Sequence, residues 1–101
     1  MNFRHLKFFV ATAESGQVSR AATQLSISQS AVTSAIKELE SELGTSLFFR
    51  TAQGMEMTEA GRDFLASTRE ILEKLELAKG MAQRQSPAKG SISIAATYTV
   101  I

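Results

Sequence analysis

The sequence predicts a mainly α-helical protein: a winged helix-turn-helix of three helices and a two-stranded wing, followed by one long helix. Three observations favour this fold. Apolar residues recur at helical spacings in three separate segments before residue 44, a short alternating pattern lies between residues 47 and 57, and helical spacing then continues unbroken to about residue 85.

Composition limits the class of protein before any motif is considered. A chain of 101 residues has the length of one ordinary domain, and its 44% hydrophobic and 21% charged residues are typical of a folded globular protein. The absence of cysteine excludes disulfides and thiolate metal sites, and no apolar stretch is long enough to cross a membrane, so we expect a cytoplasmic protein. The net charge of +1 gives no global argument for a nucleic-acid partner.

The first predicted helix runs from Phe3 to Ala13, with Asn2 as its N-cap and Gly16 at its end. Phe8 lies off the apolar stripe of this helix, where it could pack against the long helix. The stripe itself consists of Phe3, Leu6, Phe9, Val10 and Ala13.

The next two helices have the spacing of a helix-turn-helix. Ser19 is a capping-type residue at the start of a short helix that ends at Leu25, and Ser28 is placed to cap a third helix from Gln29 to Leu43. The inner stripe of the third helix consists of Val32, Ile36, Leu39 and Leu43. Small or apolar residues stand where two crossing helices and their turn would touch, at Ala22, Leu25, Ile27, Val32 and Ala35.

A hairpin and a long helix follow. Two extended runs, Leu47 to Arg50 and Met55 to Met57, are separated by a turn in which Gly54 supplies the conformational freedom, and this pattern predicts a wing. The helix from Thr58 to about Gln85 has an apolar seam typical of helices that pair side by side. We expect it to form a homodimer through Phe64, Ile71, Leu72, Leu75 and Ala78.

The sequence divides into four parts. We expect a winged helix-turn-helix over residues 1–57, a linker and dimerisation helix over 58–85, and a polar hinge over 86–91 that contains the only proline. Residues 92–101 alternate as a half-buried strand does, and we interpret them as the first strand of a truncated second domain.

The third helix leaves a purely hydrogen-bonding face outside its core stripe. Gln29, Ser30, Thr33, Ser34 and Lys37 share this face, close to the start of the helix. Base edges in the major groove present donors and acceptors that amide and hydroxyl groups can match, so this pattern favours a recognition helix. In the predicted wing, Arg50 and Gln53 would reach a phosphate or the minor groove. The candidate DNA-binding residues are therefore Arg20, Ser28, Gln29, Ser30, Thr33, Ser34, Lys37, Arg50 and Gln53.

The run RAATQLSISQSAVTSAIKELESELGTSLFFRT, followed by MTEAG and a long helix, closely resembles the N-terminal domain of LysR-type transcriptional regulators. This resemblance covers about residues 2 to 94. It implies a winged helix-turn-helix that binds double-stranded DNA, a dimer that forms a tetramer in the full-length protein, and a small-molecule effector bound only by a C-terminal domain. Three features depart from the usual family pattern: Ser30 where proline is common, Ser34 where a basic residue is common, and Ala52 with Gln53 at a frequently basic wing tip.

Other classes of function have less support. The acidic residues of the third helix have no base, nucleophile or phosphate loop near them in the sequence, so we expect neither an enzyme nor a cofactor. His5 is the only histidine, and no second metal-ligating residue clusters with it in the sequence. We therefore interpret His5 as a surface residue of the first helix and not as a metal ligand. The remaining alternative is a winged-helix module that binds protein rather than DNA, which salt-dependent binding to duplex DNA would exclude.

Overall fold

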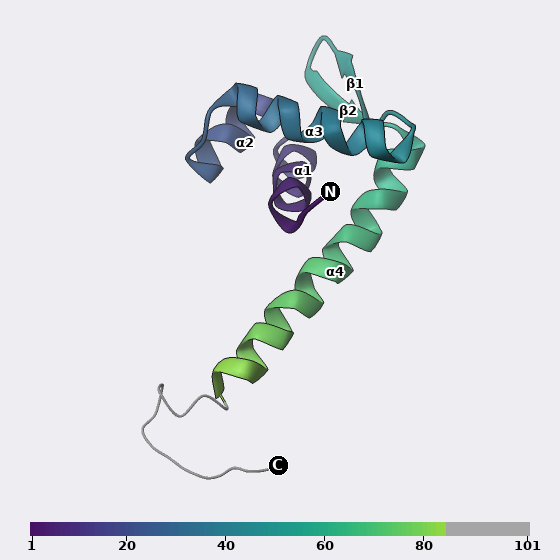
Figure 1. Cartoon of the computed structure of the whole chain (residues 1–101). Helices are drawn as coiled ribbons and strands as arrows, with labels where there is room; N and C mark the ends of the chain where they lie inside the picture. Colours follow the sequence, from purple (N-terminus) through teal and green to yellow (C-terminus); the bar gives the residue numbers. More distant parts are fainter. Residues whose placement is uncertain (85–101) are drawn as a thin grey trace.

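The computed structural model describes residues 1–84 and shows four helices and a two-stranded antiparallel sheet in this part of the chain. The elements, in order, are α1 (Phe3–Ser15), α2 (Val18–Leu25), α3 (Gln29–Leu43), β1 (Phe48–Thr51), β2 (Gly54–Met57) and α4 (Glu59–Arg84). The first three helices pack together, the hairpin stands beside α3, and α4 extends away from them (Figure 1). The predicted fold class is confirmed for these residues. The predicted hinge and the strand at 92–101 lie outside them.

Local capping chemistry sets the ends of α1 and α3. The Asn2 side chain accepts a hydrogen bond of 2.8 Å from the His5 N–H, and the Ser28 hydroxyl accepts one of 3.1 Å from the Ala31 N–H. Gly16 and Gly44 end these helices in the left-handed conformation, with φ of 78° and 72°. Both starts and both glycine stops agree with the sequence prediction.

The start of α2 was predicted one residue too late and with the wrong cap. Gln17 occupies the N-cap position and makes no side-chain capping bond, and the helix begins at Val18. Val18 packs against the core, which draws it into the first turn and leaves Ser19 exposed inside the helix. At the other end Ser26 takes the left-handed conformation, with φ of 59°, and turns the chain toward α3.

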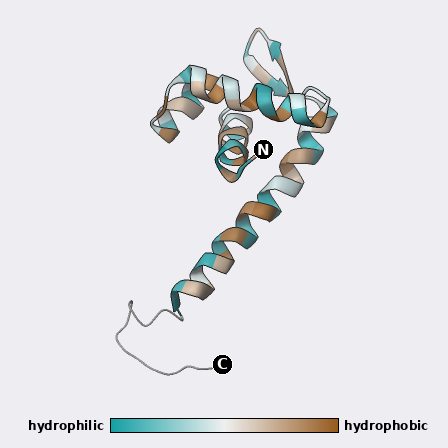
Figure 2. Ribbon diagram, viewed as in Figure 1, coloured by the Kyte–Doolittle hydropathy of each residue, from teal (hydrophilic) through white to brown (hydrophobic). Residues whose placement is uncertain are grey.

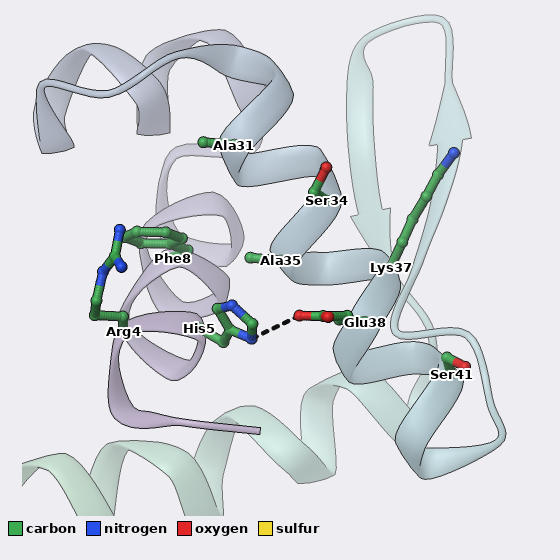
Figure 3. Close-up of a pocket in the computed structure, with 9 residues that line it drawn as sticks. All are labelled: Arg4, His5, Phe8, Ala31, Ser34, Ala35, Lys37, Glu38 and Ser41. Atoms are coloured by element: carbon green, nitrogen blue, oxygen red, sulfur yellow. Dashed lines mark ion pairs between the residues drawn. The ribbon is translucent and has the colours of Figure 1, made fainter.

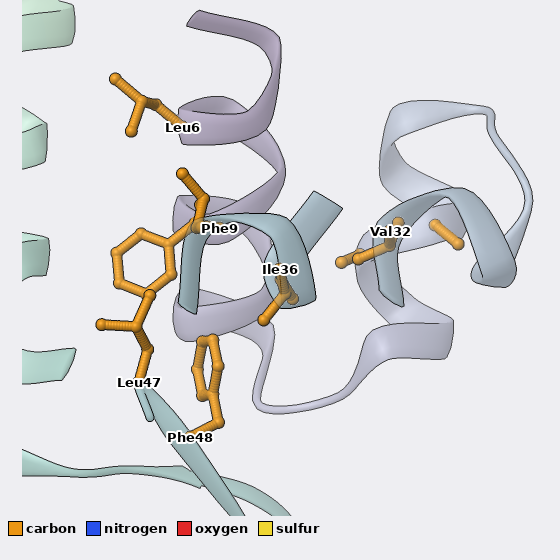
Figure 4. Packing of buried hydrophobic residues seen from close by; sticks show 9 residues of the cluster. Leu6, Phe9, Val32, Ile36, Leu47 and Phe48 are labelled. Atoms are coloured by element: carbon orange, nitrogen blue, oxygen red, sulfur yellow. The ribbon is translucent and has the colours of Figure 1, made fainter. Parts of the chain in front are cut away.

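The core lies where α1, α2, α3 and the start of β1 meet. The Phe9 ring is fully buried and contacts two other rings, that of Phe48 at 5.4 Å between centroids and that of Phe64 at 5.2 Å. Figure 4 shows Leu6, Phe9, Ile36, Leu47 and Phe48 close together, with Val32 one turn before Ile36 in α3. Aromatic pairs in tilted or edge-on geometry add to the energy of apolar burial. This cluster therefore joins α1 to the wing and to α4.

Two residues of the predicted stripes are not buried. Phe3 is 49% exposed and Leu43 is 38% exposed, because each stands at the end of its helix, beyond the neighbours that would cover it. Phe8, in contrast, is only 8% exposed. It lines a hollow between α1 and α3.

The wing is tied to the turn between α1 and α2. Its register pairs Phe48 with Met57 and Arg50 with Met55. The Met55 N–H donates a hydrogen bond of 3.0 Å to the carbonyl of Gly16. Gly54, with φ of 136°, passes so close to that carbonyl that a Cβ would lie 2.7 Å from it. Only glycine fits this turn, as the sequence predicted.

The junction between the wing and α4 is close-packed. The Thr58 hydroxyl donates a hydrogen bond of 2.7 Å to the carbonyl of Ser46 and accepts one of 2.9 Å from the Gly61 N–H, so Thr58 caps the helix. A Cβ on Gly61 would overlap the Leu47 carbonyl. The first turn of α4 is therefore fixed against the chain that leads into the wing.

The apolar side of α4 is only partly covered by its own chain. Phe64 and Leu72 pack on the core of their own chain, although both were predicted to belong to the dimer seam. Ile71 is 46% exposed, Ala78 is also exposed, and Leu75 is half-buried. Hydrophobic residues continue along the projecting part of the helix (Figure 2), where Leu77 and Met81 are exposed as well.

Candidate nucleic-acid interface

The polar face predicted on α3 points away from the core. Val32, Ile36 and Leu39 are buried on the opposite side, which fixes the rotation of the helix about its axis. As a result Gln29, Ser30, Ser34 and Lys37 are exposed and Thr33 is half-buried. Within residues 1–84, the side chains of Gln29, Ser34 and Lys37 make no hydrogen bond or ion pair, so they are available to a ligand.

The turn before α3 sets the position of this face. Ala21 and Ala22 are almost completely buried, which lets α2 and α3 approach closely. The Ile27 N–H donates a hydrogen bond of 3.0 Å to the Ala22 carbonyl across the turn. Ser28 uses its hydroxyl as the cap of α3, and the same hydroxyl lies 3.2 Å from that of Ser30. The structure therefore shows a structural role for Ser28, the capping of α3.

Basic and amide side chains surround the α3 face. Arg20 is exposed in the first turn of α2. Arg50 is exposed on β1, and Gln53 is exposed at the tip of the wing, where its N–H binds the Thr51 hydroxyl at 3.3 Å. Arg20, Arg50 and Gln53 thus lie outside α3, on α2 and the wing. The other six predicted DNA-binding residues lie on α3 or at its N-cap.

Sequence reasoning missed the role of Glu40. In the structure its carboxylate accepts hydrogen bonds from the backbone N–H groups of Leu47, at 2.7 Å, and Phe48, at 3.4 Å. Glu40 therefore joins α3 directly to the start of the wing. An acidic residue followed by an extended run does not by itself indicate such a bond.

The other two acids of α3 also have partners. Glu42 pairs with the N-terminal ammonium group at 2.7 Å, and Glu38 lies 3.4 Å from Nδ1 of His5 (Figure 3). His5 was interpreted as a surface residue, but its side chain is only 20% exposed, because α3 covers it. The ammonium group of the N-terminus offsets the negative charge of Glu42.

Neither a metal site nor a membrane span is found within residues 1–84. No three acidic or histidine side chains gather there in a way that could hold a metal ion. The helices of this part are too polar or too short to cross a bilayer. Within residues 1–84, the exposed polar residues of α3 and the wing remain as the candidate functional surface.

Residues 3–62 match the family model described as the bacterial regulatory helix-turn-helix protein, lysR family. The chain belongs to this family. The resemblance to this family that was inferred from the sequence is thus confirmed.

Individual relatives agree with this assignment. The HTH-type transcriptional regulator ClcR of Pseudomonas putida is 39% identical over 102 residues, which cover 100% of this chain and 35% of ClcR. TfdS of Cupriavidus pinatubonensis is 51% identical over 73 residues, 72% of this chain and 25% of TfdS. This lysR-family chain therefore spans about a third or less of the length of these relatives.

Solved structures share the fold. The DNA-binding domain of CbnR in complex with DNA is 39% identical, with a TM-score of 0.79, over 83% of this chain and 97% of that one. The BenM DNA-binding domain bound to catB site 1 DNA is 32% identical, with a TM-score of 0.82, over 91% of this chain and 100% of that one. Both structures are complexes with DNA, and this lysR-family chain covers 97% and 100% of the two domains.

Proposed function

We propose that this chain binds double-stranded DNA in a sequence-specific way, with the start of α3 in the major groove and the wing on the flanking backbone or minor groove. One observation carries the proposal: the outer face of α3 consists of hydrogen-bonding side chains, and three of them, Gln29, Ser34 and Lys37, have no partner within residues 1–84. Similar domains in DNA complexes support it.

The residues of the α3 face differ in what they can read. The Gln29 amide can donate to and accept from one adenine edge, which makes it suited to direct base recognition. Ser30, Thr33 and Ser34 offer hydroxyls that can serve either type of base edge. Lys37 lies two turns after Gln29 and suits a guanine edge or a phosphate. Recognition on this face would depend on amides and hydroxyls more than on charge.

Flanking contacts would come from other elements. Arg50 and Gln53 belong to the wing, and we infer that they meet a phosphate or the minor groove. Arg20, in the first turn of α2, is placed for a phosphate beside the groove. With Ala52 and Gln53 at the tip, the wing has one arginine and no second cation next to it, so Arg50 would supply most of its phosphate attraction.

We infer that the protein acts as a homodimer through α4. The packing of Phe64 and Leu72 on their own core leaves Ile71, Leu75 and Ala78 as the predicted seam residues still open to a partner, with Met81 three residues beyond Ala78. A symmetric pair of helices gains the burial of each residue twice, at roughly 2 kcal/mol for a leucine or isoleucine. Two copies of α3 would then read a site with approximate dyad symmetry.

Four further proposals concern the whole protein: its mode of action, its location, its oligomeric state and its effector. We infer that it acts by binding rather than by catalysis, works in the cytoplasm, forms a tetramer at full length, and responds to a small molecule through a further domain. The regulators that this chain matches, ClcR and TfdS among them, support only the first of these directly.

The alternative is a winged helix that binds only protein, and one experiment separates the two. Selection from a random duplex pool, followed by titration of the recovered site at several salt concentrations, should give one preferred sequence and an affinity that falls steeply with salt. No enrichment over random DNA, with no salt dependence, would contradict the proposal.

A further inference from the structure

The α3 face has one structural element on each side. On one side Glu40 binds the start of β1, so the wing lies there. On the other side lies the first half of α1, whose residue His5 faces Glu38. Glu38 and Glu40 are two residues apart on a helix and therefore point to different sides of it. The predicted DNA-binding face lies between the wing and α1.

A hollow of about 450 Å³ opens between α1 and α3 on the side away from the wing. Its lining includes Ser34 and Lys37 from the DNA-binding face, Ser41 one turn farther on, and Arg4, His5 and Phe8 from α1 (Figure 3). Ser34 and Lys37 thus belong to both surfaces. The hollow is continuous with the face proposed to enter the major groove.

Arg4 is held at the rim of this hollow by its own helix. Its guanidinium group lies over the Phe8 ring, 5.5 Å from the centroid, and Phe8 is itself buried. Such stacking restricts the long side chain while leaving its N–H donors free. Within residues 1–84, neither Arg4 nor Lys37 has a carboxylate partner. The hollow is therefore lined by two cations that have no ion-pair partner within residues 1–84, and by the hydroxyls of Ser34 and Ser41.

One group in the hollow has the opposite sign. Glu38 would repel an anion, but its carboxylate faces His5, and Lys37 points away from it in Figure 3. The charged groups around the hollow are thus Arg4, Lys37 and Glu38, with His5 as the titratable neighbour. The net charge at the rim is positive.

We propose that Arg4 binds a backbone phosphate of the DNA, on the strand across the major groove from the one that the wing meets. A helix in the major groove has a phosphate backbone on each side of it, and the wing supplies a cation on one side only. Arg4 supplies the second, on the α1 side of α3. The duplex is then held from both sides of α3. This inference rests on the proposed function.

The test measures affinity against salt concentration for wild type, Arg4→Ala, Arg4→Gln and a control, Lys7→Ala, on the selected site and on random DNA. Lys7 is an exposed cation on the same helix, outside the hollow. Loss of one phosphate contact should lower the slope of log affinity against log salt by about 0.9. Both Arg4 variants should show this loss and weaken binding to both DNAs by a similar factor, while Lys7→Ala keeps the wild-type slope.

Arg4→Gln covers the case in which Arg4→Ala unfolds, because glutamine keeps an alkyl stem against Phe8. An ethylated phosphate on the strand opposite the wing should interfere with wild-type binding and not with Arg4→Gln. A folded Arg4→Gln variant with wild-type slope and affinity would overturn the assignment of Arg4. Failure of the wild type to bind any duplex would instead overturn the proposed function itself, so the two failures are distinguishable.

Discussion

The carboxylate of Glu40 accepts a hydrogen bond of 2.7 Å from the backbone N–H of Leu47, the residue that precedes β1. The bond joins the last third of α3 to the start of the wing. Leu47 is itself fully buried, so water cannot easily replace a lost partner for its N–H. A single side chain of α3 therefore helps to set the position of the wing relative to the proposed DNA-binding face.

Removal of this carboxylate should destabilise the domain. We expect Glu40→Ala to lower the free energy of unfolding by about 1 to 3 kcal/mol, because the Leu47 N–H loses its partner in a partly buried place. Urea denaturation measures the loss. Glu42→Ala is the control: it removes an exposed pair with the N-terminus and should change stability by less than about 1 kcal/mol. Equal losses of unfolding free energy in the two variants would contradict a specific contribution of the Glu40 hydrogen bond to stability.

Two glycines of α4 should respond to alanine in opposite ways. A Cβ on Gly61 would overlap the Leu47 carbonyl, whereas one on Gly80 meets only the end of the Arg84 side chain, at 3.5 Å. Gly61→Ala should therefore destabilise by about 1 to 3 kcal/mol through overpacking. Gly80→Ala should stabilise by roughly 0.5 to 1 kcal/mol, because alanine restricts the unfolded chain. Thermal unfolding of both variants gives the answer, and a stabilising Gly61→Ala would refute the close packing at this junction.

The dimer proposal predicts that charge on one side of α4 separates the subunits. Ile71→Glu would place a carboxylate in the proposed seam of both copies, and we expect monomers in sedimentation experiments at tens of micromolar protein. Ala66→Glu adds the same charge to an exposed position on another side of α4 and should leave the dimer intact. Wild-type chain that is monomeric at this concentration, or an unaffected Ile71→Glu variant, would remove α4 from this role.

Features that depend on neighbouring residues could be predicted from the sequence. The caps at Asn2 and Ser28 and the glycine stops at Gly16 and Gly44 all follow from the local chemistry of helix ends. The glycine turn of the wing follows in the same way. The rotation of α3, and with it the exposed polar face, follows from the apolar period alone.

Features that depend on contacts between distant segments could not be predicted. The period of α4 places Phe64 on an apolar side but does not say that the Phe9 ring will cover it. Similarly, nothing local to Glu40 or Gly61 indicates that both are fitted to the chain around Leu47. Phe3 has the right spacing for burial, yet no neighbour extends far enough to cover it. The partial burial of His5 beside Glu38 of α3 also depends on such a distant contact.

The measurement that tests the central claim most directly is the affinity of Gln29→Ala for the selected site and for random duplex DNA. If α3 reads bases through this amide, the substitution should weaken binding to the selected site by about 1 to 3 kcal/mol and leave binding to random DNA nearly unchanged. Gln83→Ala, at an exposed position near the far end of α4, should change neither affinity. Equal losses on both DNAs, or no loss on the selected site, would contradict base reading by Gln29 on α3.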